Sequence, residues 1–150
     1  MFLMTELGLQ IKYEKRVNTC MWLNASTDYA IRMLICLSRA SGAVSSSKLA
    51  RTIGVSPRYL LQIGARLRDA GFVSVSFGTA GGYRLSRLPG EISLLDVITA
   101  MEGRTDLSEC RLCIKEKQEF RLLRHVYEEL EIGIARQLQA VTICELLSEE

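Results

Sequence analysis

Two neighbouring cysteines are the side chains of this sequence best suited to redox or metal-binding chemistry. Cys110 and Cys113 form a C-x2-C pair within residues 104–118, a polar stretch without clear periodicity that we interpret as a loop. From the residues alone, the pair is either a reversible thiol pair or two reduced thiols without a role. It has neither a βαβ context nor a helix start that would lower a thiol pKa, so an enzyme is not expected.

A second set of side chains has the types that read DNA. Arg58, Gln62 and Arg66 recur at four-residue steps and therefore share one edge of a predicted helix. Arginine and glutamine hydrogen-bond to base edges, and Lys or Arg side chains bind phosphates. The predicted DNA contacts are Ser46, Lys48, Ser56, Pro57, Arg58, Tyr59, Gln62, Arg66, Phe77, Thr79 and Arg84.

The charge around these residues supports that interpretation. Residues 48–87 hold seven Lys or Arg side chains and a single acid, Asp69, which is an excess of six positive charges. Such an excess suits a polyanion, because basic side chains release counterions when they bind phosphates. The alternative is a small α+β unit that binds nothing, and the charge favours DNA over it.

Local signals predict the elements that position these side chains. A serine cluster caps a short helix that ends at Gly54, and Ser56 with Pro57 begins a second helix that stops at Gly71. Two alternating runs, residues 72–76 and 83–86, then flank a glycine-rich turn over residues 78–82. A helix-turn-helix followed by such a hairpin is a winged helix.

Two flanking helices complete the predicted domain. Ser26 or Thr27 is expected to cap a first helix that continues to about Ser38, by the preference of serine and threonine for that position. After the hairpin, Ser93 and Asp96 have the spacing of a capping box, and that helix should end at Gly103.

A long amphipathic helix is predicted over residues 119–140. Its apolar residues recur at three- and four-residue steps, and one small domain cannot bury so long a stripe. The helix either folds back onto its own domain or, as we favour, packs antiparallel against the same helix of a second subunit. The predicted dimer contacts are Leu123, Tyr127, Leu130, Ile134 and Leu138. A short helix over residues 142–147 should cover the seam, with Cys144 as a small packing residue.

These predictions give a mainly α fold with a small β-wing. Residues 21–103 form the winged helix-turn-helix domain, residues 104–118 the cysteine-bearing sensor loop, and residues 119–150 the dimerisation helix and C-terminal cap helix. Residues 1–20 match no element of such a domain, and we interpret them as an extension, either disordered or an artefact of start-codon choice.

Composition restricts the setting. Residues 88–150 carry seven basic and thirteen acidic groups, so the basic middle should face nucleic acid and the acidic part protein or solvent. No run of about 18 uncharged apolar residues suggests a membrane span, and charges within the first twenty residues break a signal-peptide core. We therefore expect a cytoplasmic protein, in which an odd total of five cysteines makes no disulfide framework.

In these motifs the chain resembles the Rrf2 family of bacterial winged-helix repressors. The matching stretches are residues 27–34, 54–62, 66–71, 78–85, 92–97 and 141–147. The resemblance implies a homodimer with two wings and two recognition helices, bound to a roughly palindromic operator in double-stranded DNA.

The resemblance also implies a sensor site. Cluster-binding members place three cysteines in the loop after the post-wing helix, and some take an acidic ligand from the first helix of the partner subunit. This chain has only Cys110 and Cys113 in that loop, with Asp28 and His125 at the positions of an acidic and a histidine ligand. These four residues make an incomplete ligand set for a [2Fe–2S] cluster. Alternatively, Asp28 stabilises a helix N-terminus and His125 is a solvated or interface side chain.

One departure from the family concerns DNA contact. Many members have an arginine before the first wing glycine, whereas this chain has Phe77, which either packs beneath the wing or wedges at the DNA backbone. Arg84 would then supply the missing charge.

The expected function is that of a DNA-binding repressor whose activity is set by an iron–sulfur cluster or by the redox state of its thiols. The alternative is a cluster-free regulator controlled by a partner protein such as a metabolic enzyme.

Overall fold

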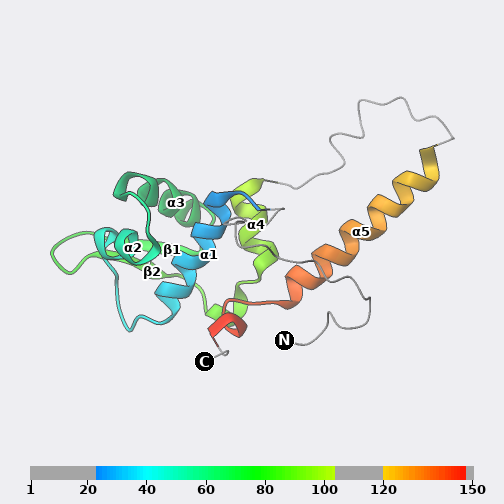
Figure 1. Cartoon of the computed structure of the whole chain (residues 1–150). Coiled ribbons are helices and arrows are strands. Elements are labelled where there is room, and N and C mark those ends of the chain that lie inside the picture. Colours follow the sequence, from blue (N-terminus) through cyan, green and yellow to red (C-terminus); the bar gives the residue numbers. More distant parts are fainter. Residues whose placement is uncertain (1–22, 104–119, 148–150) are drawn as a thin grey trace, which may run out of the picture.

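A computed structural model describes residues 23–103 and 120–147 of the chain (Figure 1). The elements are α1 (Ala25–Ser38), α2 (Ser46–Ile53), α3 (Pro57–Asp69), β1 (Val73–Ser76), β2 (Gly82–Leu85), η1 (Pro89–Glu91), α4 (Leu94–Glu102), α5 (Arg121–Ala140) and η3 (Glu145–Leu147). The prediction of a mainly helical fold with a small β-wing is confirmed. The expected N-terminal extension and the loop that carries Cys110 and Cys113 lie outside the described residues.

The helix-turn-helix forms where the local signals placed it. Ser45 caps α2 by accepting a hydrogen bond from the Lys48 N–H at 3.4 Å, and Ser56 caps α3 by accepting one from the Tyr59 N–H at 3.2 Å. Between the helices, Gly54 has φ of 80°, a left-handed conformation that favours glycine. Pro57 occupies the first turn of α3, where its missing N–H is not needed.

Helix α1 begins earlier than predicted, and its cap comes from a distant element. Asn24 is the N-cap residue, not Ser26 or Thr27, and its own side chain makes no capping hydrogen bond. Instead, the Glu102 carboxylate at the end of α4 accepts hydrogen bonds from the Asn24 N–H at 2.9 Å and from the Thr27 hydroxyl at 2.8 Å. Thr27 is fully buried, so its hydroxyl serves this contact between α1 and α4.

The core lies around α1, which contacts α2, α3, α4 and β2 (Figure 1). Its fully or almost fully buried side chains come from α1, α2, α3, β1, β2 and α4, from Phe72 and Ile92 beside these elements, and from the segment after α5. They are Ala30, Met33, Leu34, Leu37, Leu49, Ala50, Ile53, Leu60, Ile63, Leu67, Phe72, Val73, Tyr83, Ile92, Val97, Met101 and Ile143.

Strands β1 and β2 form an antiparallel hairpin, from Val73 opposite Leu85 to Ser76 opposite Gly82. The residue before the α2 cap, Val44, joins this sheet by exchanging two backbone hydrogen bonds of 2.9 Å with Tyr83. Strand β2 is therefore paired at Tyr83 on both of its edges.

The Tyr83 ring anchors the hairpin to α3. A Cβ added to Gly64, in the middle of α3, would lie only 2.5 Å from the Tyr83 Oη atom and 2.6 Å from its Cε1 and Cζ atoms. Burial raises the pKa of the Tyr83 hydroxyl above its ordinary value of 10.0, and the nearby Arg68 charge partly opposes that shift. Gly64 therefore gives the aromatic ring its place against the helix.

Helix α5 projects away from the winged domain, and its contacts are chiefly with α4 (Figure 1). Beyond it the chain returns to the domain, where the Leu94 N–H donates to the Val141 carbonyl and the Ile143 N–H donates to the Ile92 carbonyl, both at 2.9 Å. The predicted final helix is only the short turn η3. Cys144 is exposed, so its expected packing role is wrong, and the fully buried Ile143 has that role.

Candidate nucleic-acid interface

The exposed edge of α3 presents the side chains expected to read bases. Arg58, Gln62 and Arg66 are all exposed, whereas the opposite face of the helix is fixed in the core by Leu60 and Ile63. Ser56 and Pro57 lie exposed at the N-terminal end, where the positive end of the helix dipole attracts phosphates. This placement matches a recognition helix, whose N-terminal residues contact base edges.

Tyr59 has a different environment from its neighbours on α3. It is half-buried, and its ring meets Tyr29 of α1 edge to face, with centroids 5.9 Å apart and an angle of 89° between the planes. Aromatic pairs prefer this arrangement. Tyr59 therefore joins the start of the recognition helix to the start of α1.

Sequence reasoning omitted one exposed residue of this edge. Leu61, which lies between the expected contacts Arg58 and Gln62, is 52% exposed. An apolar side chain at this place can meet the methyl group of a thymine. The signal was present in the sequence, because Leu61 lies outside the apolar stripe formed by Leu60, Ile63 and Leu67.

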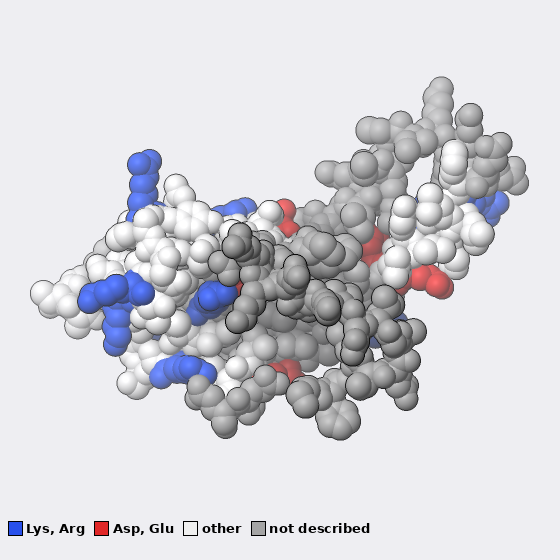
Figure 2. All heavy atoms as spheres, in the orientation of Figure 1, with Lys and Arg blue, Asp and Glu red and all other residues white. Residues whose placement is uncertain are grey.

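Positive charge gathers at the end of the molecule that carries α2, α3 and the hairpin, as the blue atoms of Figure 2 show. Lys48 and Arg84 are exposed there, and Ser46 is half-buried at the start of α2. Asp69, the single acid of residues 48–87, is held by Arg68 at 2.9 Å. The potential at this end is therefore positive, as phosphate binding requires.

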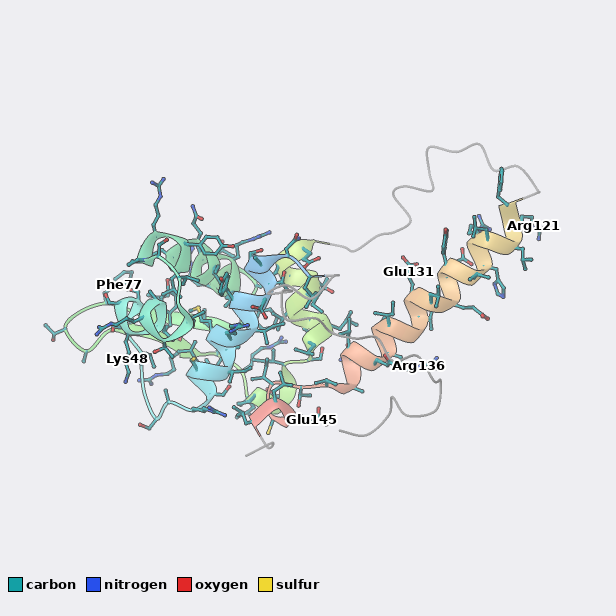
Figure 3. The ribbon with its side chains drawn as sticks, in the orientation of Figure 1. Lys48, Phe77, Arg121, Glu131, Arg136 and Glu145 are labelled. Carbon is teal, nitrogen blue, oxygen red and sulfur yellow. The ribbon has the colours of Figure 1, made fainter. Side chains whose placement is uncertain are left out.

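The hairpin tip carries Phe77 and Thr79, both exposed. Phe77 is 95% exposed, so the expectation that it packs beneath the wing is wrong. Figure 3 shows it at the same end of the molecule as Lys48. At the base of the wing, the Arg87 guanidinium lies 5.7 Å from the centre of the Phe72 ring, close enough for a cation–π contact.

The expected metal ligands are not brought together within the described residues. The Asp28 carboxylate binds the Arg32 Nε atom at 2.8 Å, and the His125 Nε2 atom lies 3.4 Å from Glu129. His125 is one turn from Arg121, which Figure 3 shows at the outer end of α5. Residues 23–103 and 120–147 contain no cluster of three His, Cys, Asp or Glu side chains that could hold a metal ion.

The stripe expected at a dimer interface is largely open to solvent. No residue of α5 is buried. Leu123, Tyr127, Leu130 and Ile134 are between 45% and 57% exposed, and Leu138, close to the domain, is half-buried.

A helix-turn-helix followed by a two-stranded wing, with basic residues on the recognition helix, defines a winged-helix DNA-binding protein. Residues 23–149 match the family model described as "Rrf2: Iron-dependent Transcriptional regulator", and the chain belongs to this family. It is a DNA-binding transcriptional regulator and not an enzyme. None of its described helices is long and apolar enough to cross a membrane.

Individual relatives agree with this assignment. The chain is 31% identical over 133 residues to the HTH-type transcriptional regulator IscR of Sodalis glossinidius, covering 87% of this chain and 81% of the relative. Among solved structures it is similar to IscR of T. potens, with 29% identity, a TM-score of 0.71 and coverage of 85% and 86%. It is also similar to CymR, the global cysteine regulator of B. subtilis, with 25% identity, a TM-score of 0.75 and coverage of 87% and 99%.

Proposed function

We propose that this regulator is a cytoplasmic, homodimeric repressor whose affinity for a DNA operator is set by the cysteine-bearing residues 104–118. The observation that carries the proposal is the presence in one chain of a basic recognition helix, α3, and of a long amphipathic helix, α5, that has no buried residue. One helix supplies contact with DNA, and the other supplies a surface for a second copy of the chain.

On DNA, α3 would lie in the major groove with Arg58 and Gln62 toward the base edges. Lys48 and Arg84 would meet phosphates on either side, and Ser46 and Ser56 would fix the two helix starts on the backbone. Thr79 would contact the backbone from the wing tip. Two such units related by twofold symmetry read half-sites about one helical turn apart, which accounts for a palindromic operator.

Dimerisation would bury the exposed stripe of α5. A 20-residue helix gains little stability from its own hydrogen bonds in water and depends on packing of its apolar face. Leu123, Leu130 and Ile134 lie on that face, each about half exposed in the single chain. Antiparallel packing of two α5 helices covers the stripe of each with that of the other.

A continuous set of contacts leads from the cysteine-bearing segment toward α3. Glu102 lies two residues before the segment and accepts the hydrogen bonds of Asn24 and Thr27 at the start of α1. One turn of α1 then carries Asp28 and Tyr29, and Tyr29 contacts Tyr59 of the recognition helix. A change in residues 104–118 that moves Glu102 can therefore alter the setting of α3.

The signal would act through Cys110 and Cys113, either as ligands of an iron–sulfur cluster or as a reversible thiol pair. For a [2Fe–2S] cluster, the two thiolates would be joined by His125 and by Asp28 of the partner subunit, which completes four ligands of mixed type. Asp28 is paired with Arg32 and His125 with Glu129, and each would leave that partner when it binds the cluster. A bound cluster would supply a redox centre that oxidants can reach.

The visible absorption spectrum of anaerobically purified full-length protein tests the cluster. We expect coloured wild type, colourless Cys110→Ala and Cys113→Ala variants, and a weaker, less stable chromophore in Asp28→Ala. Cys144→Ala, which removes a cysteine of the described C-terminal segment, is the matched control and should keep its colour. Colourless wild type without iron after reconstitution would exclude the cluster.

DNA binding before and after mild thiol oxidation tests the other route. Affinity that changes with oxidation and returns on reduction, in the wild type but not in Cys110→Ala, supports a thiol pair. If both tests fail, the second candidate is the alternative that the family resemblance leaves open, namely a cluster-free regulator whose DNA affinity is set by a partner protein such as a metabolic enzyme.

A further inference from the structure

The tip of the wing carries a phenyl ring in a place that the fold does not require. Phe77 is 95% exposed and is the most exposed of the large hydrophobic side chains that the structure describes; Leu122, the next, is 76% exposed. An apolar ring of this size gains free energy when it leaves water, so its exposure favours burial in a partner.

The backbone that carries this ring forms a tight turn. Ser76 pairs with Gly82 across the hairpin, and the Gly81 N–H donates to the Gly78 carbonyl at 3.0 Å. A side chain at Gly81 would collide with the Ser76 carbonyl oxygen, so this turn accepts only glycine there. The ring therefore projects from a narrow turn of small residues whose backbone is constrained.

Charge is absent from the tip and present beside it. Residues 76–82 read Ser-Phe-Gly-Thr-Ala-Gly-Gly and contain no charged side chain, so the tip cannot respond to the negative potential of a narrow minor groove. Arg84 is exposed on β2 of the hairpin itself, and Lys48 is exposed on α2 at the same end of the molecule (Figure 3). The arrangement is an apolar point flanked by groups that bind phosphates.

We propose that Phe77 is a wedge that inserts between two base pairs from the minor groove next to the major groove read by α3. This inference rests on the proposed DNA binding. Because β1 follows α3 directly and contacts it, the wing tip has a fixed position relative to the exposed edge of α3 that carries Arg58 and Gln62. A glycine turn is slim enough for a groove about 6 Å wide, and apolar side chains inserted there unstack a base step and kink the duplex.

The wedge adds a specificity that no hydrogen bond supplies. Pyrimidine–purine steps such as TA and CA unstack more easily than other steps, so the operator should carry such a step where the tip enters. Phe77 would then select sequence through the deformability of DNA, while Arg58 and Gln62 select it through base edges.

The test uses the full-length wild-type protein and a duplex that it selects from a library randomised over about 30 base pairs. Binding is followed by fluorescence anisotropy, bending by energy transfer between dyes at the duplex ends, and unstacking by 2-aminopurine placed at the wing step. The variants are Phe77→Ala, Phe77→Leu and, as a matched control, Leu88→Ala, which truncates another exposed apolar side chain, 68% exposed and outside the wing.

We expect Phe77→Ala to bind the duplex about tenfold more weakly and to bend it much less. The 2-aminopurine fluorescence should stay quenched, because the base remains stacked. Phe77→Leu should keep most of each signal, because leucine also serves as a wedge, and Leu88→Ala should match the wild type. Bend and fluorescence equal to wild type in Phe77→Ala would overturn the proposal, as would an effect confined to subunit association in sedimentation equilibrium. Wild-type protein that selects no sequence would instead refute DNA binding itself.

Discussion

Replacement of Gly64 by alanine sets two physical effects of opposite sign against each other. In the middle of a helix, alanine is more favourable than glycine by about 1 kcal/mol, so helix propensity alone predicts a more stable protein. The structure predicts the reverse, because the new Cβ would lie 2.5 Å from the Tyr83 Oη atom and 2.6 Å from two ring carbons. Ordinary carbon contacts are about 3.5–4.0 Å.

The overlap of about 1 Å falls on a ring that cannot yield easily. Tyr83 is buried, and its backbone is paired with Val44 on one side and Val75 on the other. Overpacking of this kind costs about 1–3 kcal/mol, and more where the neighbour is fixed. Because Tyr83 is fixed on both sides, the cost should fall in the upper part of that range, about 2–3 kcal/mol. After the gain in helix propensity of about 1 kcal/mol, we expect Gly64→Ala to lower the free energy of unfolding by about 1–2 kcal/mol.

Urea unfolding at one fixed protein concentration measures the change, since association contributes to stability. Gly133→Ala in α5 is the matched control: its Cβ meets nothing within 4 Å in this chain, so it should stabilise. The double variant Gly64→Ala/Tyr83→Leu should recover the cost of the first change, with a coupling energy above about 1 kcal/mol. If Gly64→Ala stabilised the protein as Gly133→Ala does, the proposed contact between α3 and the wing would be refuted.

Five other substitutions test the recognition helix, the dimer and the wing. Arg58→Ala or Gln62→Ala should weaken operator binding by about 1–3 kcal/mol in gel-shift titrations at fixed salt, and no effect from either would remove α3 from base reading. Leu61→Ala should relax selection at one thymine position by about 1 kcal/mol or more; an equal loss on all sequences would contradict the methyl contact. Ile134→Asp should give a monomer in sedimentation equilibrium because it places an unpaired charge in the interface, whereas monomeric wild type would refute the interface. Since burial raises the pKa of Tyr83, the unfolded chain ionises first as pH rises above 10.0, and stability should fall there in the wild type but less in Tyr83→Phe.

The sequence predicted those parts of the fold whose signals are local. Ser45, Gly54 and Ser56 act on backbone within a turn of themselves, and their caps formed as expected. The capping box of Ser93 and Asp96 also formed, with the Ser93 N–H donating to the Asp96 carboxylate at 3.1 Å.

Local signals could not predict contacts between segments that are distant in the sequence. The cap of α1 is supplied by Glu102, and nothing near residue 24 in the sequence indicates a carboxylate from another helix. Gly64 has no local reason to be glycine; the reason is Tyr83, on a strand that follows later. For the same reason, the sequence could not decide whether Phe77 packs beneath the wing or projects from it, and the structure shows that it is exposed.

The return of the chain after α5 has a consequence for how the protein folds during synthesis. Ile143 is buried in the core of a domain whose other parts end at Glu102, and its N–H donates a hydrogen bond to the Ile92 carbonyl. Closing so long a loop is entropically unfavourable and belongs to the late steps of folding. On the ribosome, chains grow at about 5–20 residues per second. The winged domain is therefore synthesised several seconds before Ile143, and during that time its core is incomplete. A nascent chain that has already made α2, α3 and the hairpin should therefore remain sensitive to proteases until residues 141–147 emerge.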